Sequence, residues 1–313
     1  MRKTYHICLS AGNSGLLCRS EEDCKYLVNC IGLAAFDTET VLLAYAVMSN
    51  HVHCCVRTKD VHSFIKRWRY MYTRYFNRKY HRVGTLGGTP FLLELKGLFH
   101  ILTAIAYVLR NPMHHGVSAT PFGYRYSSVN AVFKKEMGRQ TVRCLPAKSM
   151  YRHLPESSVP PTGWLMDETG LFLPECLIDV EDVEHMFSTA RSYLYYMNRL
   201  SSKRWEEEQA EDGGGMAPVT IYEIEHGVSL NDMKTMLNNE FGRANYNAMS
   251  DTELCGIIDD LCHQLHGVTS VYQLDMDTRL QWVGQLVRSH HVTVAQAFRC
   301  LAIPGPSDAE TEK

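Results

Sequence analysis

The chain has 313 residues, 45% of them hydrophobic and 21% charged, and its 32 basic and 34 acidic residues nearly cancel. This length allows two domains, or one domain with a large extension, and a sizeable core. No apolar run approaches the length of a membrane span, and the first ten residues lack the apolar stretch of a signal peptide. We therefore expect a soluble cytoplasmic protein whose eleven irregularly spaced cysteines stay reduced.

The first 60 residues predict a strand, a helix and a hairpin. Residues 4–10 read as a short strand, and Ser20 followed by three acids is a typical helix N-terminus. Two apolar runs, 41–48 and 51–57, are joined by two polar residues and predict an antiparallel hairpin.

A long helix should then span roughly residues 61–80. A glycine-rich turn leads to a fourth strand at 91–95 and a helix at about 98–111, which should stop at an Asn-Pro pair. The order is therefore β-α-β-β-α-β-α. Its first six elements match the split βαβ pattern of a ferredoxin-like α+β fold with an antiparallel sheet.

Composition divides the rest of the chain, which should be mainly α-helical. A helix from about 180 to 210 ends in an acidic tract, and three glycines follow as a flexible linker. Residues 292–299 resemble a helix-turn-helix recognition segment, although any two amphipathic helices joined by a turn give that pattern. The expected divisions are a domain at 1–135, a connector at 136–177, a helix and acidic linker at 178–212, a helical domain at 216–305 and a tail at 306–313.

A pair of histidines begins the second strand of the predicted hairpin. His51 and His53 are two residues apart, so both imidazoles lie on one face of the strand and can bind one ion. We expect that face to border a site rather than the deep core. With 15 histidines in the chain, a pair of this spacing also arises by chance.

The helix predicted at 98–111 carries a second pair of functional side chains. Tyr107 and Asn111 are four residues apart and share one face. A phenol can attack phosphorus, and an amide carbonyl can bind a metal. The competing interpretation is a half-buried tyrosine beside a helix stop.

The helix predicted at 61–80 is basic and aromatic. With the two residues that follow, it has seven basic residues and no acid, a composition that suits phosphates and unstacked bases. The stripe of Phe64, Trp68, Tyr72 and Phe76 at helical spacing predicts core packing. The basic face can equally be a solvated surface.

Together these residues resemble the single-tyrosine HUH transposases of the insertion-sequence-200 type, and specifically the REP-associated tyrosine transposases. The resemblance covers about residues 3–133, in family order. Two departures are the absence of a basic residue in 10–13 and Ser49, where the family usually has proline. The matching blocks are Tyr5-His6, Val47–His53, Tyr72–Asn77, Tyr107–Pro112, His114–Gly116 and Tyr126–Ser128.

The resemblance implies an HUH nuclease domain in which His51, His53 and Asn111 bind Mg²⁺ or Mn²⁺. Tyr107 would attack DNA to give a 5′-phosphotyrosine and a free 3′-OH, and the reverse step would rejoin strands. The implied substrate is single-stranded or hairpin DNA, with no membrane partner and a homodimer left open. Candidate DNA contacts are Lys66, Arg67, Arg69, Arg74 and Arg110.

Two other functions stay open at this level. One is a protein that binds DNA hairpins but no longer cuts them, although the four residues of the expected chemistry are all present. The other is a replication-initiator-type HUH nuclease, which shares the histidine pair and the tyrosine. The form Tyr-x-x-x-Asn-Pro favours the transposase.

Overall fold

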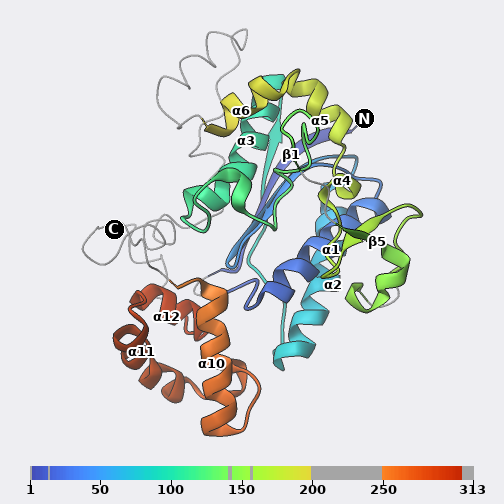
Figure 1. The fold of residues 1–313 in the computed structure, drawn as a ribbon. Helices are drawn as coiled ribbons and strands as arrows, with labels where there is room; N and C mark the ends of the chain where they lie inside the picture. The colour runs from blue at the N-terminus through green and yellow to red at the C-terminus, as the bar shows by residue number, and fades with distance from the viewer. Residues whose placement is uncertain (1, 13–14, 140–142, 156–157, 199–248, 305–313) are drawn as a thin grey trace.

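The computed structural model describes residues 2–12, 15–139, 143–155, 158–198 and 249–304 of a mixed α+β protein (Figure 1). The predicted order of its first seven elements is confirmed. They are β1 (Lys3–Ser10), α1 (Glu21–Asp37), β2 (Val41–Val47), β3 (His51–Thr58), α2 (Val61–Tyr80), β4 (Phe91–Leu95) and α3 (Leu98–His114). The later elements are β5 (Cys144–Pro146), β6 (Leu165–Asp167), α4 (Pro174–Leu177), α5 (Val180–Phe187), α6 (Ala190–Asn198), α10 (Asp251–His266), α11 (Met276–His290), α12 (Val294–Cys300) and three short 3-10 segments, η1 (Pro121–Gly123), η2 (Ala147–His153) and η3 (Val271–Gln273).

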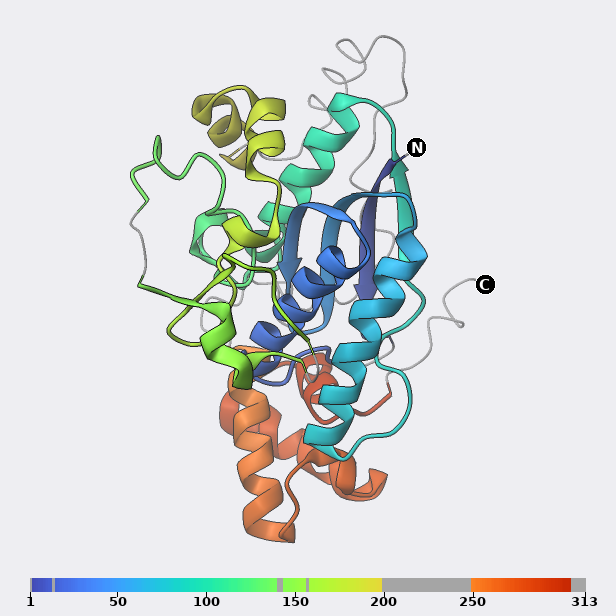
Figure 2. The same ribbon diagram turned by 90° about the vertical axis from the view of Figure 1, so that its right-hand side faces the viewer.

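Strands β1 to β4 form one antiparallel sheet in the order β2-β3-β1-β4. Helices α1 and α2 cover one face of this sheet, and α3 covers the other (Figures 1 and 2). Side chains alternate between the two faces along each strand, so the register decides which residues meet α3. In β1 and β3, Cys8 pairs with His53 and His6 with Cys55.

The face with α1 and α2 holds most of the aromatic core. The predicted stripe of Phe64, Trp68, Tyr72 and Phe76 is at most 1% exposed, which confirms it as core. Helix α1 begins as expected, because the Ser20 side chain accepts from the Asp23 amide in a capping box.

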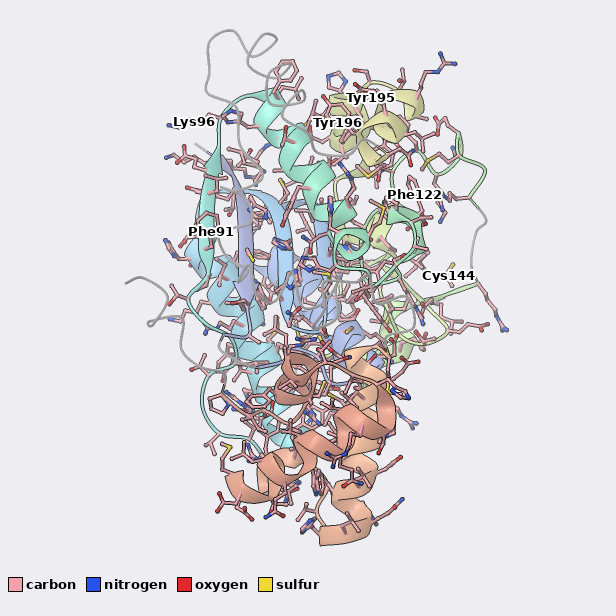
Figure 3. The ribbon with its side chains drawn as sticks, turned by 90° about the vertical axis from the view of Figure 1, so that its left-hand side faces the viewer. Phe91, Lys96, Phe122, Cys144, Tyr195 and Tyr196 are labelled. Carbon is pink, nitrogen blue, oxygen red and sulfur yellow. The ribbon has the colours of Figure 1, made fainter. Side chains whose placement is uncertain are left out.

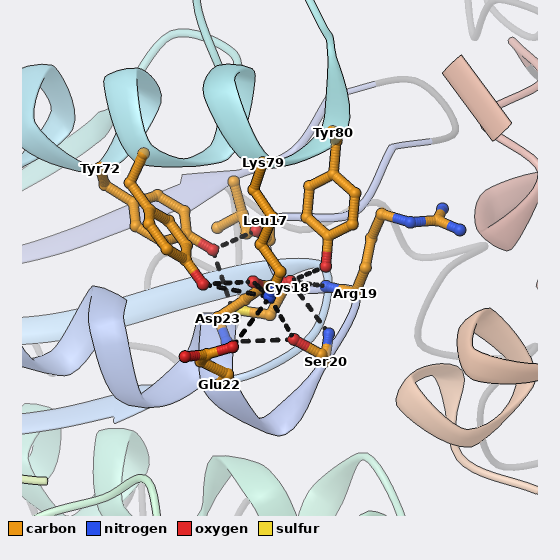
Figure 4. A network of polar contacts seen from close by, with 10 residues as sticks. Leu17, Cys18, Arg19, Ser20, Glu22, Asp23, Tyr72, Lys79 and Tyr80 are labelled. Carbon is orange, nitrogen blue, oxygen red and sulfur yellow. Dashed lines mark hydrogen bonds and ion pairs between the residues drawn. The ribbon is translucent and has the colours of Figure 1, made fainter. Parts of the chain in front are cut away.

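Asp23 does more than cap α1. Its buried carboxylate accepts hydrogen bonds from Tyr80 at 2.7 Å and Tyr75 at 3.0 Å, and Lys79 lies 2.7 Å away, all from α2 (Figure 4). Tyr72 donates instead to the backbone oxygen of Leu17 at 2.6 Å. These bonds fix the last two turns of α2 against the start of α1.

Helix α3 is longer than expected. It continues through Pro112 to His114, so the prediction that it stops at Asn111-Pro112 is wrong by three residues. Proline removes one helix hydrogen bond and crowds the carbonyl four residues earlier, but its φ is compatible with a helix. The chain turns once more because the His115 amide still donates to the Asn111 oxygen at 3.1 Å.

The chain after α3 first forms small elements around the sheet. The connector contains the hairpin of β5 and β6. The described part of the helix expected from about 180 to 210, which ends at residue 198, is two helices, α5 and α6, broken where Ser188 has a φ of 64°. Figure 3, seen from the α3 side, shows Tyr195 and Tyr196 on α6, and Phe91 and Lys96 at the β4 edge of the sheet. The acidic tract, the glycine linker, residues 216–248 and the tail at 306–313 lie outside the described residues.

Helices α10, α11 and α12, with the short segment η3, form a second hydrophobic cluster below the sheet (Figure 1). We call residues 249–304 the C-terminal module. Its cluster includes Leu16, which belongs to the segment between β1 and α1. No helix in the described parts of the chain combines the length and apolar character that crossing a membrane requires.

Candidate functional site

The β1–β3 register gathers histidines on the sheet face that α3 covers. Cys8 lies opposite His53, and His6 lies two residues further along the same face of β1. The His6 and His53 rings stack with centroids 5.1 Å apart. The His51 and His53 rings lie 5.0 Å apart, so the predicted pair does share a face.

Helix α3 brings the predicted tyrosine and asparagine to this cluster. The Tyr107 ring packs edge-on against His53 and His6, with centroid separations of 5.4 and 6.1 Å. One turn later, Asn111 Oδ1 lies 2.8 Å from His51 Nε2. Four of the residues expected for the chemistry therefore converge, although they come from segments about 60 residues apart.

His51 is held between two amide oxygens, because its Nδ1 lies 2.7 Å from Asn50 Oδ1. A neutral imidazole has a single N–H. If Nδ1–H donates to Asn50, then Nε2 keeps its lone pair and faces the Asn111 oxygen. Two such lone pairs fit one cation, since ligands at ~2.1 Å and a right angle lie ~3 Å apart. The other solution turns the Asn111 amide, so that Nδ2, which lacks a partner in the described residues, donates to Nε2.

His53 is oriented differently. Its Nδ1 lies 3.0 Å from His6 Nε2, and its Nε2 faces the Cys8 sulfur at 3.9 Å. As it stands, His51 and Asn111 fit a shared ion, and His53 joins them only if its ring turns away from His6. In the described part of the chain, no three His, Cys, Asp or Glu side chains converge to hold a metal.

The histidines are more deeply buried than expected for a strand that borders an open site. His6, His51 and His53 are all 0% exposed, and Tyr107 is 4% exposed. Burial lowers the pKa of His6 to about 3 and that of His51 to about 4, and it holds the pKa of His53 well below its usual value. The imidazoles are therefore neutral at pH 7, the form that binds metals.

Sequence reasoning missed His6, Cys8 and His115 as members of this cluster. The His115 ring lies 4.7 Å from that of His51, and neither of its nitrogens has a hydrogen-bond partner within the described residues. The sequence did place His115 four residues after Asn111, and His6 and Cys8 two residues apart on one face of a strand. Only the strand register could bring them to the same point.

Arg110 lies on the same side of α3 as Tyr107. It is 4% exposed, and its Nε and Nη2 have no hydrogen-bond partner in the described residues. Burial lowers the pKa of this guanidinium, and its positive charge in turn adds to burial in lowering the pKa of His114 to about 4. A buried cation of this kind favours an anion beside it.

The other four candidate DNA contacts lie on α2, which covers the face of the sheet opposite to α3 (Figure 2). Lys66 and Arg74 are exposed, and Arg74 lies over the Tyr70 ring. Arg67 pairs with Asp37 of α1 at 2.7 Å, and Arg69 donates to the backbone oxygens of Leu86 and Gly87.

Although α2 has no acid of its own, some of its charges are compensated. Helix α1 supplies acids to Arg67 and Lys79, which a scan of α2 could not detect. Lys66 and Arg69 line a hollow of about 570 Å³ between α2 and the segment before β4. Its remaining lining residues are His62, Ile65, Tyr70, Thr73, Thr85, Thr89, Pro90 and Leu92.

Comparisons with known proteins give little beyond this geometry. No family model matches the chain, and no curated protein matches it. Among solved structures, it is similar to a REP-associated tyrosine transposase bound to a REP hairpin, with a TM-score of 0.36 and 16% sequence identity. The match covers 44% of this chain and 80% of that one.

Proposed function

We propose that this chain is a metal-dependent tyrosine nuclease and strand transferase that cleaves and rejoins single-stranded or hairpin DNA. The motif resemblance supplies the class of reaction. The observation that carries the proposal is the convergence of Tyr107, His51 and Asn111, with His51 Nε2 and Asn111 Oδ1 2.8 Å apart. His51 lies 60 residues before Asn111 in the chain, so only the fold brings it to the pair of Tyr107 and Asn111 on α3.

We also propose that residues 1–135 form a ferredoxin-like HUH domain. The order β-α-β-β-α-β and the antiparallel strand order β2-β3-β1-β4 support this assignment. The two helices of the split βαβ unit lie on one face of the sheet. The other face is then available for α3 and the candidate site.

The chemistry follows from the side chains present. A divalent ion held by His51, Asn111 and a reoriented His53 would polarise a non-bridging oxygen of the scissile phosphate. The Tyr107 oxygen attacks phosphorus, the phosphorus–O3′ bond breaks, and the phenol proton ends on the departing 3′-oxygen. Arg110 offers its guanidinium N–H groups to the phosphate, which would satisfy a buried charge.

The burial of Tyr107 favours a second candidate. At 4% exposure the phenol cannot meet a phosphate until the site opens. A chain that binds hairpins without cutting them would keep this closed arrangement. The reaction itself separates the two candidates, because only the nuclease becomes linked to DNA.

The test is a covalent adduct. The full chain is incubated with Mn²⁺ and with hairpin or single-stranded DNA, and is then denatured and separated on a gel. The label lies downstream (3′) of the candidate cleavage positions, on the fragment that would stay linked to the protein through its 5′-phosphate. The proposal predicts labelled protein that survives denaturation and disappears with protease. Binding of the same DNA without any adduct would instead support the hairpin-binding protein.

A further inference from the structure

The C-terminal module contacts the turn that presents His51. Ser49, in the β2–β3 turn, donates to Asp251 Oδ2 of α10 at 2.7 Å. Asp251 is 5% exposed and also accepts from Arg299 and Gln296 of α12. A turn residue two positions before His51 is therefore bound to a buried ion pair more than 200 residues away in the chain.

Several partners hold the Asp251 carboxylate in one position. Burial raises the pKa of the Asp251 carboxyl, but Arg299, Ser49 and Gln296 more than offset this and hold the pKa below its usual value. Arg299 makes two hydrogen bonds to the carboxylate, at 3.0 and 2.9 Å. A paired, fully hydrogen-bonded carboxylate of this kind has little freedom to move.

The same turn is held from a second side. The amides of Leu17 and Cys18 donate to the Ser49 backbone oxygen at 2.7 and 2.8 Å, and the Ala11 amide donates to the Asn50 backbone oxygen at 2.8 Å. Asn50 in turn bonds His51 Nδ1 through its side chain. Whatever fixes the Ser49-Asn50 turn therefore also fixes the orientation of the His51 imidazole.

The module is also anchored at Arg19, which Figure 4 shows beside the Asp23 network. Its buried guanidinium donates to Asp259 Oδ1 and to the Cys300 backbone oxygen at 2.7 Å each, and it lies over the rings of Tyr80 and Tyr272. This contact docks the module against the segment before α1, in which the Leu17 and Cys18 amides also bind the Ser49 backbone oxygen. The Ser49–Asp251 bond is a further contact, in which the module binds the turn directly.

We propose that Asp251 is a positioning residue of the candidate site: it fixes Ser49, and through the turn it sets the His51 imidazole against Asn111. The inference rests on the proposed function for its catalytic meaning. Its structural content, that the module orients His51, can be judged without any cleavage. The C-terminal module is on this account part of the nuclease site.

The experiment compares Ser49→Ala with Ser270→Ala in the full chain. Each change removes one hydroxyl that joins the module to the rest, since Ser270 Oγ donates to the backbone oxygen of Tyr80, the last residue of α2, at 2.9 Å. Three quantities are measured: the ¹⁵N signals of His51, which report its tautomer, the affinity for Mn²⁺, and the rate of adduct formation at saturating DNA.

We expect Ser49→Ala to shift the His51 signals, weaken Mn²⁺ binding and slow adduct formation about tenfold, while Ser270→Ala leaves all three unchanged. Tenfold corresponds to about 1.4 kcal/mol, near the strength of one hydrogen bond to a charged group. If both variants shift His51 equally, or neither does, the positioning role is overturned. If wild type makes no adduct, the proposed function fails, and the His51 signals still decide the positioning role.

Discussion

Removing single charges near α2 tests whether this helix binds the DNA backbone. Each phosphate contact on single-stranded DNA contributes about 0.7 to the slope of log K against log salt. From sequence, replacing Lys66, Arg67 and Arg69 together with Gln should flatten the slope by about 2. The structure lowers this figure to about 1.4, because the Arg69 guanidinium is half-buried and already bonds the Leu86 and Gly87 oxygens.

The individual variants sharpen the test. Lys66 is exposed and pairs with no carboxylate in the described residues, so Lys66→Gln should flatten the slope by the full value of about 0.7. Arg67 must give up Asp37 before it can contact a phosphate. A half-exposed ion pair of this kind contributes about 0.2–1 kcal/mol, so Asp37→Asn should tighten DNA binding by up to about fivefold at fixed salt.

Fluorescence anisotropy of a labelled hairpin, titrated between 50 and 300 mM KCl as an assay range, measures both quantities. Val83→Ala, at a residue 89% exposed beside α2, is the control for surface change without loss of charge. An unchanged slope in Lys66→Gln, with unchanged affinity in Asp37→Asn, would refute the reasoning. The DNA would then run along the α3 face, where Arg110 is buried.

Three further predictions concern the histidine and tyrosine cluster. Tyr107→Phe should abolish the adduct but change DNA affinity by less than about twofold, which is less than the contribution of one hydrogen bond. If adducts persist, another tyrosine is the nucleophile. His51→Ala or His53→Ala should remove Mn²⁺ binding in a calorimetric titration. Because both histidines are buried, each change should also lower the free energy of unfolding by about 1–3 kcal/mol. Undiminished metal affinity in both variants would contradict the assignment. In the folded protein the pKa values of His6 and His114 are about 3 and about 4, below the usual value near 6.5. Below pH 6.5 the unfolded chain therefore binds protons that the folded protein does not. The free energy of unfolding should be highest above pH 6.5 and fall by about 1.4 kcal/mol per pH unit per histidine toward pH 4. Urea unfolding of the metal-free protein at pH 7 and pH 5 measures this, and equal midpoints would contradict it.

The parts of the fold and site that could be predicted from sequence depend on short-range periodicity. The spacing of His51 and His53 on a strand, and that of Tyr107 and Asn111 on a helix, each determine a shared face without knowledge of the partner. The capping pattern at Ser20 likewise located the start of α1. The motif order then suggested that the two pairs meet.

The rest depends on contacts between distant segments. His6 joins the cluster through the β1–β3 register, and a slip of one residue would turn it to the other face. Asp37 and Asp23 neutralise charges of α2 only because α1 packs beside it. No local pattern at Asp251 indicates that it meets Ser49, since neither residue shows any periodicity that refers to the other.

The docking of the C-terminal module also determines when the site can be completed during synthesis. The bond from Arg19 to the Cys300 oxygen closes a loop of 281 residues, and the bond from Ser49 to Asp251 closes one of 202. The sheet and α3 can assemble before the C-terminal module has been made. The Ser49 hydroxyl in the turn before His51, however, lacks its acceptor Asp251 until residue 251 has been translated. Contacts of this sequence separation form late. The nascent protein therefore carries an incomplete candidate site, and the turn before His51 should reach its final arrangement only after the C-terminal module has been translated.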